Sequence, residues 1–170
     1  MIFECSASSG PVVIVRADLR CQAHAQALVT LLDSYARDPM GGGEPLSAYA
    51  RAHLAETLAA RPGTHVLLAF IEAQPVGLLN AFEGFSTFAC RPLLAVHDIA
   101  VAPGWRGQGV GQKLLAEAEV VAREIGACKL TLEVLDGNAP AQAAYRKAGF
   151  APYVLDPALG RAQFWQKVLD

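Results

Sequence analysis

A glycine-rich segment contains the residue types best suited to binding an anion. It runs from Val101 to Gln112 with the sequence VAPGWRGQGVGQ and lies between an apolar strand pattern and an amphipathic helix pattern. Glycines at alternate positions let the main chain approach a ligand closely, and the start of a helix adds unpaired N–H groups and the positive end of a dipole. The arginine contributes a fork of donors suited to phosphate. The segment is therefore predicted to bind a phosphate-bearing ligand through Arg106, Gly107, Gln108, Gly109, Val110, Gly111 and Gln112.

The spacing of the glycines excludes two common phosphate-binding loops. A dinucleotide-binding fingerprint has the form G-x-G-x-x-G, but counting from Gly107 the third glycine position is occupied by Gln112. A P-loop requires Gly-Lys-Ser/Thr after four intervening residues, whereas Gly104 and Gly109 are followed by Val110 and Gly111. The remaining alternative is that the glycines form only a tight turn between a strand and a helix.

The spacing R-x-x-G-x-G, formed by Arg106, Gly109 and Gly111, resembles the signature of the GNAT superfamily of acetyltransferases. In that family the loop holds the pyrophosphate of coenzyme A. The end of the preceding strand hydrogen-bonds the pantetheine arm, a role that the resemblance gives here to Ile99, Ala100 and Val101. The resemblance implies acetyl-CoA as the co-substrate and no metal.

A second block, from Leu130 to Phe150, resembles the strand and helix that follow in the same family. It contains the spacing N-x-x-A-x-x-x-Y at Asn138, Ala141 and Tyr145. The resemblance places Asn138 at a pantetheine amide, adds Ala141 to the cofactor-binding residues and places Tyr145 near the sulfur.

Acetyl transfer from a thioester to an amine requires a base, a polarised carbonyl group and a proton for the departing thiolate. An alkylamine has a reference pKa of about 10.4, so few molecules are nucleophilic at neutral pH without a base. The main-chain N–H of Val101 is the first candidate for polarising the carbonyl group. Tyr145 lies on the same helical face as Ala141 and is the candidate general acid; the alternative is that its ring seals the edge of the core.

His97 is the candidate base. The segments Phe85–Phe88 and Pro92–Ile99 resemble the branch of the family that contains diamine and thialysine acetyltransferases, which usually has Glu-Asp where this chain has His97-Asp98. A histidine can accept the amine proton directly or through water, but it supplies no negative charge to attract a polyamine. Because consecutive strand residues face opposite sides of a sheet, the pair can line one wall only if a bulge intervenes. The alternative role for His97 is a hydrogen-bonded structural histidine.

The residues that bind the acceptor are harder to identify. Candidates are the side chains that flank the Gly41-Gly42-Gly43 loop and two residues of a predicted strand, namely Tyr35, Asp38, Glu44, Glu83 and Phe85. Their carboxylates are suited to a cationic amine or are solvated surface charges. The expected acceptor is a small or amino-acid-like primary amine. The alternatives are a protein or peptide N-terminus, or a module that binds coenzyme A without catalysis.

Hydrophobic periodicity predicts the element order βααβββαβαββ, a mixed sheet covered by helices. This order agrees with the GNAT family, and the resemblance implies a GNAT-like α/β (α+β) fold with a mixed, mostly antiparallel twisted sheet flanked by helices. Strands are expected over 11–16, 65–71, 76–85, 93–101 and 129–135, and helices over 19–36, 47–60, 110–125 and 140–148. A final hairpin is expected from Phe150, with a turn over 156–160 and a return strand that carries Phe164, Trp165, Val168 and Leu169. Residues 1–170 are expected to form one domain.

Composition narrows the classes of function. Hydrophobic residues make up 53% of the chain and the formal net charge is -2, which argues against disorder and against nucleic acid as a partner. The four cysteines lack metal-finger spacing, no apolar run is long enough to cross a membrane, and Met1 to Gly10 lacks the features of a signal peptide. We therefore expect a cytoplasmic protein with reduced thiols, no membrane contact and a small-molecule substrate. A homodimer is also expected, because members of the family often pair.

Overall fold

The computed structural model describes residues 10–160 and 162–169. The chain divides into two compact units, Met1–Leu132 and Glu133–Asp170, which are described one at a time. Three of the four cysteines, Cys21, Cys90 and Cys128, are free thiols, whereas Cys5 lies outside the described residues. Within the described residues, every helix is too short or too polar to span a lipid bilayer.

The first unit is built on a five-stranded sheet in the order β1-β2-β3-β4-β5. The first four strands pair antiparallel, and the short last strand pairs parallel with β4, which confirms the predicted mixed, mostly antiparallel sheet. Runs of β-branched and leucine residues bounded by turns account for these strands. The strands are β1 (Val12–Arg16), β2 (Thr64–Ile71), β3 (Gln74–Ser86), β4 (Arg91–Val101) and β5 (Leu130–Leu132).

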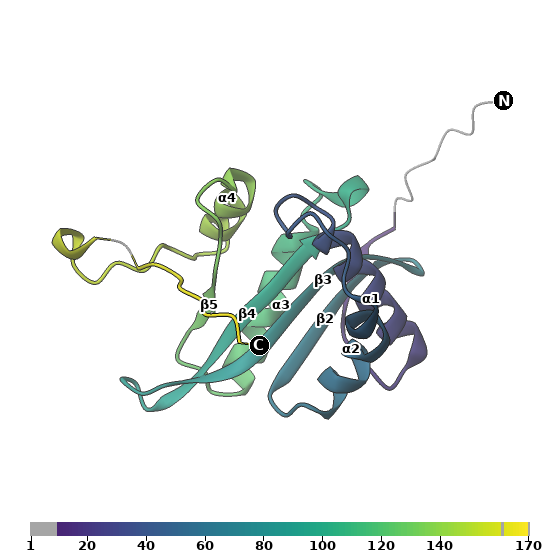
Figure 1. Ribbon diagram of the computed structural model, residues 1–170, viewed down its shortest axis with the longest axis horizontal. Coiled ribbons are helices and arrows are strands. Elements are labelled where there is room, and N and C mark those ends of the chain that lie inside the picture. Colours follow the sequence, from purple (N-terminus) through teal and green to yellow (C-terminus); the bar gives the residue numbers. More distant parts are fainter. Residues whose placement is uncertain (1–9, 161, 170) are drawn as a thin grey trace. The chain divides into compact units, whose positions relative to one another are not determined.

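Helices cover both faces of this sheet (Figure 1). On one face, α1 (Gln22–Ala36) and α2 (Ala48–Ala60) pack against β2 and β3 around the buried side chains of Leu28, Leu68 and Leu78. On the other face lies α3 (Val110–Glu124). Its buried residues are those that the helical period predicts, namely Val110, Leu114, Leu115, Ala118, Val121 and Ala122.

Close packing of α3 on the sheet depends on the missing side chain of Gly77 in β3. A Cβ atom at this position would lie 3.0 Å from Val110 Cγ1, 3.1 Å from the main-chain oxygen of Ala100 and 3.2 Å from Leu114 Cδ1. These distances are shorter than ordinary van der Waals contacts, and one of them is to main chain that cannot rotate away. The first turn of α3, which follows the glycine-rich turn, therefore packs directly against β3.

The second unit contains α4 (Ala139–Lys147), whose N-cap Asn138 accepts a hydrogen bond from Ala141 N at 3.2 Å. Gly149, with φ of 88°, follows the helix as predicted. The predicted C-terminal hairpin is wrong for the described residues, because 150–160 and 162–169 contain one short 3-10 helix, Pro157–Leu159, and no strand.

The turn of that expected hairpin does form, since Asp156 Oδ1 accepts a hydrogen bond from Ala158 N at 2.9 Å and Gly160 has φ of 85°. The apolar side chains that follow, including Phe164 and Trp165, are exposed rather than buried against a neighbouring strand. Aromatic and β-branched residues give strand propensity, but a hairpin is stable only when it pairs or packs against further structure. The structure therefore confirms the predicted turn but not the predicted strands of the hairpin.

The packing at Gly77 can be tested with alanine. We expect Gly77→Ala to lower the free energy of unfolding by about 1–3 kcal/mol, because a methyl group there overpacks the contact between β3 and α3. Gly104→Ala is the control, since a Cβ atom at Gly104 meets nothing within 4 Å and its φ is ordinary. Denaturant unfolding of the two variants measures the difference. Equal stability would show that α3 shifts to accept the methyl group at no cost.

Candidate functional site

A β-bulge in β4 determines which way the candidate base points. Asn80 of β3 is opposite Asp98, but the next residue, Ala81, is opposite Val96, so His97 is an extra residue in β4. The main-chain hydrogen bonds show the same change. Before the bulge, Leu94 N donates toward the β5 side, to Lys129 O; after it, Ala102 N donates toward β3, to Val76 O.

Because of this bulge, His97 and Asp98 face the same side of the sheet. Consecutive strand residues can line one wall of a site only where such a bulge intervenes. Asn80 Nδ2 donates to Asp98 Oδ2 at 2.9 Å, and the Phe82 ring lies edge-on to His97 with centroids 5.6 Å apart. Asn80 and Phe82 are two residues apart on β3 and so share a face. His97 Nδ1 lies 3.3 Å from Asp98 Oδ1. This is the face covered by α1 and α2.

Asn80 is a site residue that the sequence analysis missed. Its side chain is 1% exposed, and its Oδ1 atom is buried without a hydrogen-bond partner in the described residues. An unpaired buried acceptor costs free energy that a bound donor, or a water molecule, would recover. The available signal was a single amide inside the apolar run VGLLNAF.

The end of α1 brings two predicted acceptor residues, Tyr35 and Asp38, to the same region. Burial raises the pKa of the Tyr35 hydroxyl, and the nearby charges of Asp98 and Asp38 raise it further. The Tyr35 hydroxyl also donates a long hydrogen bond of 3.4 Å to Met40 O. The tyrosine thus lies between a carboxylate on β4 and another in the glycine loop, which makes this part of the site negative.

Asp38 organises the glycine loop rather than projecting freely into solvent. Its Oδ1 accepts from Met40 N at 2.9 Å, and its main-chain oxygen accepts from Gly41 N and Gly43 N at 2.7 and 3.1 Å. Its Oδ2 accepts from Arg106 Nη2 at 2.9 Å. The Met40 N–H, followed by Arg106, holds the pKa of the Asp38 carboxyl below its usual value. Glu44, in the same loop, is exposed.

Two other predicted acceptor residues are not brought to this region. Glu83 Oε1 lies 2.8 Å from His65 Nε2, and both residues lie on the face of the sheet that α3 covers. Phe85 points to that same face by the alternation of β3 and is 58% exposed. It is five residues beyond Asn80, or about 16 Å along the strand. The structure therefore separates Glu83 and Phe85 from His97.

The glycine-rich turn has the geometry of an anion cradle. Gly107 and Gly109 have φ of 76° and 82°, and a Cβ atom on either would meet nothing within 4 Å, so their open side is accessible. The first hydrogen bond of α3 runs from Lys113 N to Gly109 O, so Val110 N and Gly111 N have no carbonyl in a preceding helical turn. Gln108 Nε2 donates to Gly104 O at 3.1 Å and closes the turn. The cradle therefore fits the phosphate-bearing ligand that the sequence predicts.

The end of β4 beside this turn has an unpaired edge in the part of the chain that the structure describes. β5 pairs only with residues 94–96, so no described strand lies along the same edge of residues 97–101. Since Ala102 N points toward β3, alternation directs the main-chain polar groups of Ile99 and Val101 to the open edge. Such an edge can hydrogen-bond an extended chain that contains amides.

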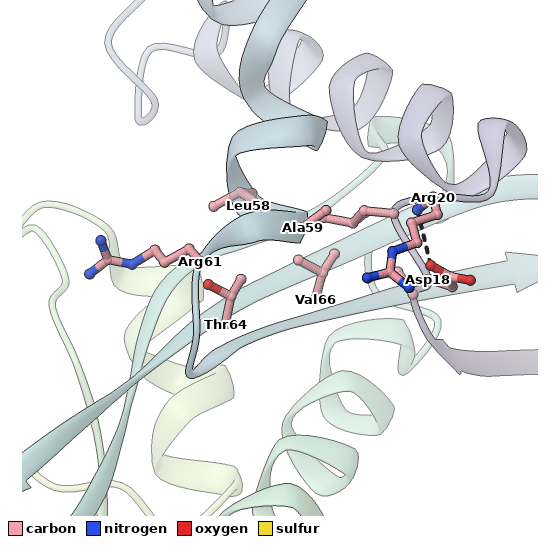
Figure 2. Close-up of a pocket in the computed structure, with 9 residues that line it drawn as sticks. Asp18, Arg20, Leu58, Ala59, Arg61, Thr64 and Val66 are labelled. Atoms are coloured by element: carbon pink, nitrogen blue, oxygen red, sulfur yellow. Dashed lines mark hydrogen bonds between the residues drawn. The ribbon is translucent and has the colours of Figure 1, made fainter.

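A shallow pocket of about 200 Å³ lies on the α2 side of the sheet, away from the open edge of β4 (Figure 2). It lies between the segment after β1, the end of α2 and the start of β2, and Figure 2 shows the Arg61 side chain directed away from Asp18 and Arg20. The Arg61 guanidinium lies 5.4 Å from the centre of the Phe82 ring, whose edge meets His97. The pocket contains none of the residues predicted from the sequence.

The remaining predicted residues belong to the second unit. Tyr145 is partly buried, and its ring centre is 6.2 Å from that of Phe150 at 60°. The side-chain oxygen of Asn138 is used as the helix cap, which leaves its NH₂ group as the part suited to a ligand carbonyl. Among the described residues, no three His, Cys, Asp or Glu side chains are grouped as a metal ion would need.

Two curated acetyltransferases are similar to part of this chain. Streptothricin acetyltransferase of Streptomyces lavendulae is 47% identical over 90 residues, which cover 53% of this chain and 48% of that protein. Thialysine N-epsilon-acetyltransferase of Bos taurus is 34% identical over 96 residues, covering 52% and 56%. The chain thus spans about half the length of these curated relatives.

Solved structures show the same fold. A probable acetyltransferase superposes with a TM-score of 0.78 at 24% identity, covering 93% of this chain and 99% of that one. An aminoglycoside acetyltransferase from an uncultured soil metagenomic sample, in complex with sisomicin, superposes with a TM-score of 0.74 at 19% identity, covering 94% and 97%. The model of the acetyltransferase (GNAT) family matches residues 34–150, and the chain belongs to that family.

Proposed function

We propose that this protein transfers the acetyl group of acetyl-CoA to a primary amine of a small cationic molecule. The observation that carries the proposal is the position of the anion cradle, which follows directly from the strand that presents His97 and Asp98. A ligand held by its phosphates at residues 106–111 can extend along the open edge of β4 toward these side chains.

The donor side of the proposal rests on main-chain groups. The N–H groups of Gly109, Val110 and Gly111, at the positive end of α3, would bind the diphosphate of acetyl-CoA. Ile99 and Val101 would pair with the amides of its pantetheine arm, with the Val101 N–H also available to the thioester carbonyl. Asn138, Ala141, Gln108 and Gln112 are assigned to the same ligand by the family motif.

The acceptor side rests on charge. Asp98 lies near the partly buried Tyr35 and beside His97, and its carboxylate would attract an ammonium group. Relatives named for streptothricin and thialysine, and a fold neighbour named for aminoglycosides, all carry names of compounds that bear amines. A small molecule with more than one amine is the class of acceptor that this site would favour.

The proposed chemistry is direct attack. The ammonium group gives its proton to His97, and the neutral nitrogen attacks the thioester carbon while the Val101 N–H stabilises the developing oxyanion. The C–S bond then breaks, and the thiolate takes a proton from the Tyr145 hydroxyl, as the family motif suggests. The acylated nitrogen loses its second proton, which restores the Tyr145 hydroxyl through solvent, and His97 releases the first proton to water. The products are an N-acetyl amine and free coenzyme A.

The free thiols at Cys21, Cys90 and Cys128 favour a reducing compartment, so a cytoplasmic location belongs to the same proposal. Action as a homodimer is also proposed, and light scattering of the purified protein would measure it.

Assay with acetyl-CoA against a panel of amines tests the function. The panel contains polyamines, aminoglycosides, streptothricin, single amino acids and a peptide with a free N-terminus, and release of coenzyme A is followed. We expect turnover on small multi-amine compounds, and slower turnover by Tyr145→Phe, which keeps the ring but loses the hydroxyl. Turnover on the peptide alone would replace the acceptor class, and binding of coenzyme A without turnover on any amine would identify a sensor.

A pair of glycine substitutions tests the anion cradle. Gly109→Ala forces a side chain into a positive φ at the phosphate turn, whereas Gly126→Ala imposes the same strain at the other end of α3, where φ is 69°. Both variants should lose about 1 kcal/mol of stability. Only Gly109→Ala should lose affinity for coenzyme A, by tenfold or more in a calorimetric titration. Equal affinities in the two variants would remove the cradle from the binding site.

The role of His97 can be tested by its dependence on the acceptor's own protonation. We expect His97→Gln to lower kcat/KM by about 100-fold at neutral pH, the usual contribution of a general base. The deficit should narrow as the pH approaches the pKa of the amine, because a neutral amine needs no base. His53→Gln, an exposed histidine on α2, is the control. A deficit that stays constant with pH would indicate a structural histidine.

A further inference from the structure

In the described part of the chain, the ion pair between Asp38 and Arg106 joins the glycine loop after α1 to the anion turn before α3. Arg106 Nη2 donates to Asp38 Oδ2 at 2.9 Å although the two residues are 68 positions apart. Arg106 Nε also donates to Val101 O at 3.1 Å. The guanidinium group is therefore held between two acceptors. One is on the strand that leads into the turn, and the other is on the glycine loop after α1.

These two contacts leave part of the arginine fork for a ligand. A guanidinium group has five N–H donors in a rigid plane, and the contacts to Val101 and Asp38 use only some of them. Holding a long side chain in one orientation before the ligand arrives removes an entropic cost from binding. The arginine side chain is 53% exposed and would otherwise sample many rotamers.

Asp38 is itself fixed. Its other carboxylate oxygen accepts from Met40 N, and its main-chain oxygen accepts from two glycine N–H groups, so it cannot swing without unfolding the loop. Its carboxyl group is 22% exposed, and the lowered pKa keeps it ionised at neutral pH. In the described residues its ion-pair partner is Arg106, which makes a direct role in binding an acceptor amine less favourable.

We propose that Asp38 is a positioning residue that orients Arg106 for the diphosphate of acetyl-CoA and so ties the glycine loop on the acceptor side to the donor site. This inference rests on the proposed function and assigns to Asp38 a different role from acceptor binding. It makes the glycine loop part of the donor site.

The proposal predicts a change in the affinity for coenzyme A that is opposite in sign to the change expected from charge alone. Removing one negative charge near an anionic ligand should tighten its binding, whereas removing the group that orients Arg106 should weaken it. We expect Asp38→Asn to raise the Kd for coenzyme A and the KM for acetyl-CoA by about tenfold, with less than a twofold change in the KM of the amine. Asp38→Glu should recover part of the affinity, because it retains a carboxylate.

A double-mutant cycle separates this role from general damage to the loop. In an Arg106→Gln background, Asp38→Asn should have no further effect on the Kd for coenzyme A, since Asp38 acts through Arg106. Glu56→Gln, on the exposed face of α2, controls for the loss of one charge. All variants are compared by calorimetric titration with coenzyme A, which does not require turnover.

The outcomes are distinguishable. If Asp38→Asn binds coenzyme A as well as the parent protein does, or more tightly, the positioning role is wrong while the proposed function stands. If that variant instead raises the KM of the amine alone, Asp38 binds the acceptor. If the parent protein does not bind coenzyme A at all, the proposed function itself fails.

Discussion

The extra residue in β4 is the constraint on which the rest of the site depends. Without the bulge at His97, Asp98 would point to the face that α3 covers, and the main-chain groups of Ile99 and Val101 would point into the pairing with β3. The bulge reverses both the alternation of side chains between the two faces of the sheet and the alternation of main-chain groups between the two edges of β4. It turns a polar pair toward α1 and directs the strand's remaining hydrogen-bonding groups to the open edge, where β5 has already ended. One inserted residue thus accounts for the direction of the side chains and of the main chain.

The two halves of the site differ in how local their structure is, and this decides how much the sequence could predict. The anion turn is encoded by residues close together in the chain, because positive φ at Gly107 and Gly109 and the start of α3 need no distant partner. The helical period and the strands of the central sheet follow from the same kind of local pattern. The final hairpin was predicted correctly only at its turn, because the turn residues are local. The prediction of its strands was wrong for the described residues, since strands need a pairing partner that a local pattern does not specify.

The acceptor side depends on register, which single-residue patterns do not determine. The sequence indicated Tyr35, Asp38 and His97 as candidates. It could not show that a bulge turns His97 and Asp98 to one face, or that Asn80 is paired opposite Asp98. It also grouped Glu83 and Phe85, which lie on one predicted strand, with the acceptor. The alternation of β3 places them on the other face, with Glu83 already paired to His65. Residue type indicated the chemistry, and the pairing of strands decided which residues share a site.

The charges around Tyr35 then acquire unequal roles. Asp38 is compensated by Arg106 at 2.9 Å, whereas Asp98 accepts a hydrogen bond from the neutral amide of Asn80 and lies beside His97. A carboxylate paired with a guanidinium group presents little net field to a further cation, so the attraction felt by an approaching ammonium group comes mainly from Asp98. In the proposed function, an ammonium group drawn to Asp98 would arrive next to the imidazole that would take its proton. The same bulge that aligns His97 with Asp98 would then place cation attraction and proton acceptance at one point on β4.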